Sequence, residues 1–252
     1  VATSAVRAEL KVVTTIKPLH SLIANVMDGV GEPALIIEGS TSPHSFTLKP
    51  SHAKLLEEAD IIFWVGEGIE TFMERPLESI VKNAEVVEFM EVESINKLKF
   101  REESIFEDHD DHDDHDDHDD HDDHDDHDDH DDHDDHDDHD DHDDHDDHDD
   151  HDDHSGHDHH GHAHGEFDAH IWLDPMNAKE MVHEITHELG DLDPANKNKY
   201  EANAQVTIQA LDQLANDIEK GINKDAKFVV FHDAYQYFEE RFGVRAAGAL
   251  TL

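Results

Sequence analysis

The sequence predicts an α/β protein built from parallel βαβ units, and two observations indicate this class. From Lys11 onward, short apolar runs rich in Val and Ile alternate with longer amphipathic stretches. Two of these stretches begin with a proline, Pro18 and Pro50, which fits the first turn of a helix because the N–H that proline lacks is unpaired there anyway. We therefore expect helices packed on a parallel sheet.

The expected elements alternate along the chain as such units require. Strands are expected at residues 12–16, 35–37, 61–65, 86–89, 170–173 and 228–231, and helices at residues 18–27, 50–58 and 71–82. A longer helical pattern covers residues 194–222, in which Tyr200, Ala204, Ile208 and later apolar residues recur at intervals of three and four. A helix of this length can bridge two lobes.

The negative charge of the chain is concentrated in one segment. The 252 residues include 66 acids and 18 bases, which gives a formal net charge of −48. Residues Asp108 to Asp158 contain 32 of the acids and no base, so the rest of the chain is acidic only to an ordinary degree and can fold. We expect no nucleic-acid partner, because the chain offers no basic patch to neutralise phosphates.

The same segment is rich in histidine. His-Asp-Asp repeats with a strict period of three from His109 to His154, and a looser His-rich stretch continues to His164. This period does not match a helix and the repeat contains no apolar residue, so we expect a disordered loop over residues 108–165. Imidazole beside carboxylate predicts weak zinc sites, for example at His109, His112, His115, His118, His157, His159, His160, His162 and His164. The alternative is an expansion that only solvates the protein.

The two ends of the chain carry further signals. Val6-Arg7-Ala8 is typical of the end of a secretory signal peptide, so residues 1–8 are interpreted as its remnant and we expect export. The last residues stop inside an apolar run, so we interpret the chain as a fragment at both ends. No apolar run approaches the roughly 20 residues of a membrane-spanning helix, and we expect a soluble protein.

Cysteine is absent, so histidine and carboxylate must hold any metal. His183, Glu184 and His187 form an H-E-x-x-H pattern, which on a helix places two zinc ligands on one face beside a glutamate base. Gly190 and Asp193 extend this pattern, so that it resembles metzincin peptidases with the last ligand replaced by Asp. A zinc metallopeptidase is therefore the sharpest alternative function.

Two observations weaken this alternative. Metzincins need a methionine turn beneath the zinc, whereas the last methionine of this chain is Met181, upstream of the motif. The helix also has a core-facing stripe of its own, which turns the two histidines toward solvent and comprises Ala178, Met181, Val182, Ile185 and Leu189. Gly190 is then expected to act as a helix C-cap.

Three other histidines stand near the ends of expected strands. His44 lies in a polar loop before the helix at residue 50, His170 opens an expected strand, and His232 directly follows one. Ligands of α/β proteins gather in the crevice at such strand ends. Sequence periodicity alone cannot join the three, and each taken singly is more often a structural or surface histidine.

Five segments carry a resemblance to a known family. They are residues 14–20 (TTIKPLH), 42–51 (SPHSFTLKPS), 59–66 (ADIIFWVG), 170–175 (HIWLDP) and 231–239 (FHDAYQYFE). Their order and spacing resemble the zinc-specific substrate-binding proteins of bacterial ABC transporters, the ZnuA type, over roughly residues 10–107 and 167–252. A His-rich acidic loop between the first two ligands is also a habit of this family.

The resemblance implies a particular architecture. Its members have two α/β lobes joined by a long rigid helix, with zinc held between the lobes. For this chain it implies an N-terminal lobe at residues 9–193 that includes the His/Asp loop, a linking helix at residues 194–222, and the start of a truncated C-terminal lobe at residues 223–252.

The resemblance also implies a metal site and a role. The three family ligands fall on His44, His170 and His232, and a histidine at the third position favours zinc over manganese. Pro43 stands where some relatives have a glutamate, so the fourth ligand stays unassigned, and His20 and His52 are expected to be structural. The implied protein is a periplasmic, monomeric zinc carrier without enzyme activity, which delivers Zn²⁺ to a permease of the inner membrane. A weak metal-storage protein that works through the His tract is a further alternative.

Overall fold

A computed structural model of the chain describes residues 9–101 and 165–251. The chain divides into two units, of which one comprises Val1–Asp108 with Gly161–Leu252 and the other His109–His160. The second unit lies wholly outside the described residues. The expected signal-peptide remnant and the expected weak zinc sites of the His tract, from His109 to His164, also lie outside them.

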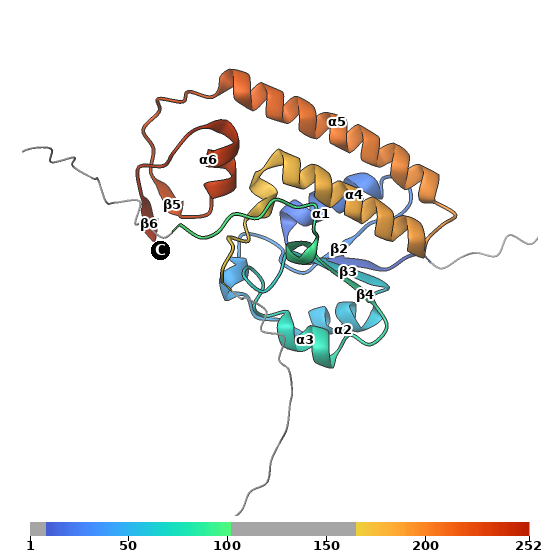
Figure 1. Cartoon of the computed structure of the whole chain (residues 1–252). Helices are drawn as coiled ribbons and strands as arrows, with labels where there is room; N and C mark the ends of the chain where they lie inside the picture. The colour runs from blue at the N-terminus through green and yellow to red at the C-terminus, as the bar shows by residue number, and fades with distance from the viewer. Residues whose placement is uncertain (1–8, 102–164, 252) are drawn as a thin grey trace, which may run out of the picture. The chain divides into compact units, whose positions relative to one another are not determined.

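A four-stranded parallel sheet forms the centre of the first unit (Figure 1). Its strand order is β2-β1-β3-β4, in which β1 is Val12–Thr14, β2 is Ala34–Leu35, β3 is Ile61–Trp64 and β4 is Glu85–Glu88. Every residue of β1 and β3 is buried, as expected for central parallel strands covered on both faces. The predicted α/β class with parallel strands is confirmed.

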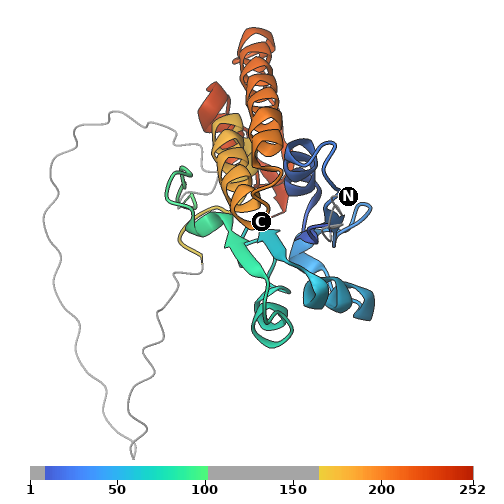
Figure 2. The ribbon, with the colours of Figure 1, turned by 90° about the vertical axis from the view of Figure 1, so that its right-hand side faces the viewer.

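Helices cover both faces of this sheet (Figures 1 and 2). On one side, α1 packs with the two long helices α4 and α5, and on the other side lie α2 and α3. Their bounds are α1 Lys17–Val26, α2 Pro50–Glu58, α3 Glu74–Ser79, α4 Pro175–Leu192 and α5 Lys197–Gly221. The prolines at the starts of α1 and α2 occupy the first turn, as the sequence predicts. Among the described residues, every helix is too short or too polar to cross a lipid bilayer.

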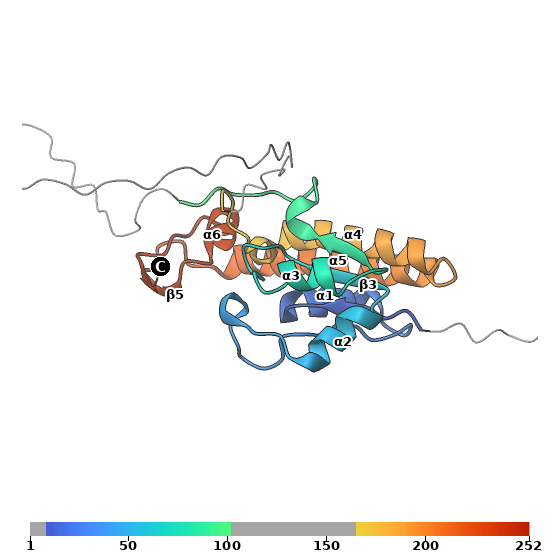
Figure 3. The ribbon, with the colours of Figure 1, turned by 90° about the horizontal axis from the view of Figure 1, so that it is seen from below.

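The C-terminal part of the described chain carries a second, smaller sheet. Strands β5, Val230–His232, and β6, Ala249–Thr251, pair in parallel, and α6, Gln236–Phe242, lies between them in sequence. Figure 3 shows α5 running from the four-stranded sheet toward this part. Gly243 ends α6 in the left-handed conformation, with a φ of 64°, which glycine adopts at little steric cost.

The strand predicted at residues 170–173 is wrong. The residues Ile171–Leu173 form a 3-10 helix, η3, and two further short 3-10 helices are η1, Pro43–Ser45, and η2, Phe89–Glu91. The carboxylate of Asp168 accepts a hydrogen bond from the backbone N–H of His170 at 2.9 Å, which turns the backbone out of an extended path. Asp174 then caps α4 by accepting from the N–H of Met176.

Other boundaries differ by a few residues. The expected C-cap Gly190 is wrong, because α4 continues to Leu192 and Gly190 lies buried inside it, where an added Cβ would meet the Lys197 side chain at 3.2 Å. The long helix begins at Lys197 rather than residue 194, and α3 is shorter than the predicted 71–82. The last strand is shifted, so that His232 ends β5 instead of following it.

Candidate metal centre

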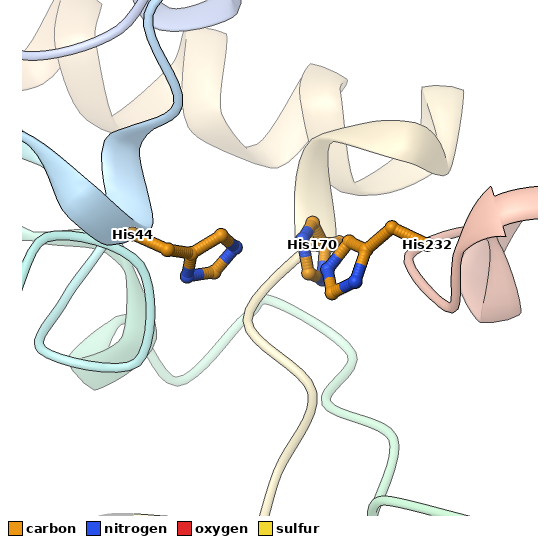
Figure 4. A group of neighbouring side chains, drawn as sticks. All are labelled: His44, His170 and His232. Atoms are coloured by element: carbon orange, nitrogen blue, oxygen red, sulfur yellow. The ribbon is translucent and has the colours of Figure 1, made fainter. Parts of the chain in front are cut away.

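His44, His170 and His232 come together in space, and we call this cluster the three-histidine site (Figure 4). His44 lies on η1 in the connection from β2 to α2, His170 directly precedes η3, and His232 is the last residue of β5. Figure 4 shows the three rings pointing toward one another from three separate segments. The sequence separates these segments widely, so only the fold can assemble them.

The ring geometry suits a shared cation. One candidate ligand nitrogen of each histidine lies within 4.8 Å of those of the other two. The ring centroids are 5.6 Å apart for His44 and His170, and 5.4 Å apart for each of the pairs with His232. Zinc–nitrogen bonds of about 2.0 to 2.1 Å allow ligand atoms spaced by less than about 4 Å, so small rotations of the side chains would complete the geometry.

Asp168 orients the ring of His170. The Nδ1 atom of His170 lies 2.7 Å from Oδ1 of Asp168, and both side chains are buried, with 11% and 2% of their surfaces exposed. An ionised carboxylate can only accept, so Nδ1 carries the proton and Nε2 keeps a lone pair. A carboxylate that fixes the tautomer in this way is typical of metal-ligating histidines.

The surroundings of the other two histidines also suit metal binding. Nε2 of His232 is buried without a hydrogen-bond partner among the described residues. His44 is exposed as a residue, but partial burial of its ring lowers its pKa, and the nearby rings of His170 and His232 lower it further, although Asp168 opposes them. A lowered imidazole pKa favours the neutral form, which is the form that binds metal.

The donor set fits zinc better than hard cations. Within the described residues, the group of side chains close enough together to share one metal ion consists of three imidazoles and contains no carboxylate. Nitrogen ligands suit zinc and neighbouring transition metals, whereas magnesium and calcium prefer oxygen. Pro43, beside His44, contributes no side-chain ligand. A water molecule or an added carboxylate can therefore complete a tetrahedron.

Comparisons with known proteins agree with this geometry. The family model of the zinc-uptake complex component A, periplasmic (ZnuA), matches residues 12–251. This chain belongs to that family. The high-affinity zinc uptake system protein ZnuA of Brucella abortus is 47% identical over 243 residues, which cover 96% of this chain and 67% of the relative. The protein of the same name from Paracoccus denitrificans is 36% identical over 249 residues, 98% of this chain and 68% of the relative.

Solved structures show the same fold. Zn(II)-bound AdcA from Streptococcus pneumoniae matches with a TM-score of 0.63 at 19% identity, over 95% of this chain and 39% of AdcA. A crystal structure of ZnuA matches with a TM-score of 0.62 at 19% identity, over 94% of this chain and 69% of that protein. The chain thus spans about two thirds of the length of its ZnuA relatives.

The H-E-x-x-H histidines of this ZnuA-family chain lie elsewhere. His183 and His187 are exposed on α4, opposite the predicted core stripe, whose five residues are all buried. Asp193, the residue that extends the motif, is buried, and its Oδ2 accepts from Nδ2 of Asn196 and the hydroxyl of Tyr200. No third ligand joins the helical pair within residues 9–101 and 165–251. The prediction of a solvated face is confirmed, and the comparisons do not support a peptidase.

His20 and His52 have structural contacts. Nε2 of His20 lies 3.1 Å from the carbonyl oxygen of Pro33, and Nδ1 of His52 accepts from the N–H of Lys49 at the start of α2. Both contacts tie neighbouring backbone together, in keeping with the structural role expected from the sequence.

Sequence reasoning missed two residues beside the site. Asp168 precedes His170 by two residues, and an acid two positions before a candidate ligand is a signal that could have identified it. The hydroxyl of Tyr237 donates to the backbone carbonyl of Asp168 and accepts from the N–H of Leu98 at 3.0 Å. Tyr237 lies in the segment 231–239 that carries the resemblance, but nothing local indicates its role, because these contacts connect residues far apart in the chain.

Proposed function

We propose that this chain captures Zn²⁺ through His44, His170 and His232 and delivers it to an ABC-type permease of the inner membrane for import. The zinc is cargo, so its binding must be tight yet reversible and requires no covalent chemistry. Membership of the ZnuA family supports the role in zinc uptake. The periplasm is the location that this role implies.

The observation that carries the proposal is the convergence of three imidazoles on one point. His170 is buried and held by Asp168, and His232 presents a buried nitrogen without a partner among the described residues. Burying polar atoms without a partner costs free energy, so a nitrogen left in this state indicates a missing ligand. Three neutral imidazoles leave the charge of the ion uncompensated, so a water or carboxylate is expected as the fourth ligand.

Zinc titration of the whole chain tests the proposal. Trp172 provides a local signal, because its ring centroid lies 5.4 Å from that of His170. Zinc should change the tryptophan fluorescence with a one-to-one stoichiometry, in competition with a chelator of known affinity. Replacing His44, His170 and His232 together by Ala should abolish this change.

The matched control replaces the exposed histidines of α4. The variant with His183→Ala and His187→Ala also loses imidazoles, but should keep the full fluorescence change and its affinity. A peptidase would behave differently: Glu184→Gln would abolish hydrolysis of casein by the wild-type chain. Loss of the tight zinc signal in the helical control, or its survival in the triple variant, would contradict the proposed site.

For the His tract we propose a collector or buffer that raises the local zinc supply. The described residues that flank it support a connection with the site. Lys99 and Phe167 form an antiparallel bridge, and the N–H of Asp168 donates to the carbonyl of Leu98. Described residues that flank the tract in sequence on both sides are therefore paired next to Asp168.

Deleting the repeat at residues 109–154 separates storage from capture. The number of zinc ions bound per chain should fall, while the tight site reported by Trp172 remains. If calorimetry found no tight site after the deletion, the tract would be the main binder and a metal-storage protein would be the better description.

We also propose that residues 9–193 and 223–252 belong to two lobes linked by α5. Their separate parallel sheets and the 25-residue length of α5 support this division. A continuous helix resists bending, so release should require only small local shifts. X-ray scattering profiles with and without zinc should nearly coincide, and a large closure would argue against a rigid link.

A further inference from the structure

Helix α6 connects the segment of His232 to the segment of His170. It begins four residues after His232, and the hydroxyl of its Tyr237 donates to the backbone carbonyl of Asp168. The same hydroxyl accepts from the backbone N–H of Leu98 at 3.0 Å. The Tyr237 hydroxyl therefore contacts both paired segments, the one with Leu98 and the one with Asp168. Tyr237 also follows His232 closely in sequence.

The position of this hydroxyl is well defined. Tyr237 is only 1% exposed, and burial raises its pKa to about 12, so the hydroxyl keeps its proton and can donate. At the other end of α6, Arg241 donates to both oxygens of Asp174, at 2.7 and 2.6 Å. Such a two-point guanidinium–carboxylate contact fixes orientation as well as distance. Helix α6 is therefore held at both ends against the segment of His170.

These contacts bear directly on the metal geometry. Asp168 holds the ring of His170 through its carboxylate, while its carbonyl is held by Tyr237. A shift of α6 would move the Asp168 backbone and the His232 segment relative to each other. Metal ligands lose affinity when the groups that orient them are loosened, because the site must then be ordered as the metal binds.

We propose that Tyr237 is a positioning residue of the three-histidine site, which holds the Asp168–His170 pair and the His232 segment in the relation that zinc binding requires. This inference rests on the proposed zinc site. Tyr237 is not one of the three ligands, so its effect must pass through Asp168 and the His232 segment. Removing the hydroxyl should weaken zinc binding about tenfold, the lower end of what loss of a group that orients a ligand costs.

The chain contains a matched control for this substitution. Tyr200 on α5 is also fully buried, and its hydroxyl donates to a carboxylate oxygen of Asp193 at 3.1 Å. Tyr237→Phe and Tyr200→Phe each remove one buried hydroxyl from the 252-residue chain. Zinc titrations read by Trp172 fluorescence should show a dissociation constant raised about tenfold for Tyr237→Phe and unchanged for Tyr200→Phe. Equal constants for the two variants would overturn the inference.

A double-mutant cycle separates positioning from a general loss of stability. In the background of Asp168→Asn, Tyr237→Phe should weaken zinc binding less than tenfold, because the part of its effect that passes from the Asp168 backbone through the carboxylate to His170 is already gone. Tyr200→Phe should leave the affinity unchanged in both backgrounds. A tenfold loss that persisted in the Asp168→Asn background would contradict the inference, since the two residues would then act independently.

Hydrogen exchange of the unmodified chain tests the same coupling without a substitution. The Leu98 N–H donates to Tyr237, so zinc at the three-histidine site should slow its exchange several-fold. An unchanged exchange rate at saturating zinc would contradict the inference. The zinc site itself is tested by comparing the wild type with His170→Ala. If zinc left Trp172 fluorescence unchanged in the wild type, or changed it equally in His170→Ala, the proposed site would fail and this inference would fail with it.

Discussion

The three-histidine site and the helical pair of His183 and His187 place imidazoles in opposite ways. The pair shares one face of α4, where the side chain of His187 is 64% exposed. The three-histidine site draws on three distant segments, and the side chain of His170 is 11% exposed. The cluster that is scattered in sequence is the one that can surround an ion.

The acids near each set of histidines act differently. Asp168 binds Nδ1 of His170 and thereby leaves Nε2 as the nitrogen available to a metal. His187 instead has Glu188 near Nδ1, at 3.1 Å, and Asp191 near Nε2, at 3.7 Å. Glu188, and then Asp191, raise the pKa of His187, whereas burial and two imidazoles lower that of His44. The local motif therefore favours the protonated form of a surface imidazole, whereas the fold favours, at His44, the neutral form that can bind a metal.

The largest expected effect is the loss of a single imidazole from the three-histidine site. His170→Ala should weaken zinc binding by more than about 100-fold, because loss of a ligand costs more than loss of a group that orients one. His44→Ala should cost less, since His44 is exposed and water can take its place. Competition titrations with a chelator measure both constants.

The control for this prediction is His187→Ala, which should leave the zinc constant unchanged. If tight zinc binding depended on His187 rather than on His170, the helical pair and not the three-histidine site would hold the metal. Thermal unfolding of each variant without zinc shows whether the substitutions keep the fold.

A smaller loss of zinc affinity is expected when the carboxylate beside His170 is removed, and none when the carboxylate beside His187 is removed. Asp168→Asn should weaken zinc binding about 10- to 100-fold, because His170 loses the acceptor that fixes its tautomer. Glu188→Gln removes the carboxylate beside His187 and should not change the constant. Calorimetry with a competing chelator distinguishes the two, and equal constants for both variants would remove the orienting role of Asp168.

The pH dependence of zinc binding should be weaker than that of free imidazoles. Three ordinary imidazoles, with a pKa of about 6.5, would lose about sixfold in affinity on acidification from pH 7.5 to 6.5. The pKa of His44 is lowered, so protons compete with zinc for it only at lower pH. We expect less than about a sixfold loss over this interval, measured by Trp172 fluorescence in competition with a chelator, and a larger loss would contradict the lowered pKa.

The smallest expected effect concerns the stability contributed by His187. Its pKa in the folded state is raised by Glu188, so its contribution is fully present below the ordinary value of about 6.5 and is lost as the pH rises through the raised value. In the presence of a chelator, His187→Ala should lower the unfolding temperature at pH 5.5 by on the order of 1 °C, because the pair is exposed, and leave it unchanged at pH 8.5. In the Glu188→Gln background this difference should shrink, and a larger effect at pH 8.5 would refute the assigned cause.

Much of the fold could be predicted because its signals are local. Val- and Ile-rich runs bounded by helices indicate buried parallel strands, and the apolar stripe of α4 predicts which side faces solvent. The strand predicted at His170 failed because the Asp168 carboxylate turns that backbone. The C-cap predicted at Gly190 failed because close packing against Lys197 suits a glycine inside α4.

The features of the three-histidine site also differ in how far the sequence could predict them. The three ligand positions were reached by resemblance to a family, and their role as ligands stays a prediction that the titrations test. The orienting role of Asp168 could have been inferred from its place two residues before His170. The contact of Tyr237 with Asp168 could not, because its donor and acceptor lie 69 residues apart.

By itself, the sequence determined the class of the fold, the acidic His-rich segment and the amphipathic face of α4, since each depends on the properties of neighbouring residues. Only the tertiary structure decided which histidines meet, which nitrogen of His170 is left open, and that α6 lies against the His170 segment. Metal coordination requires several atoms within a few ångströms of one point, and that condition depends on how distant segments pack.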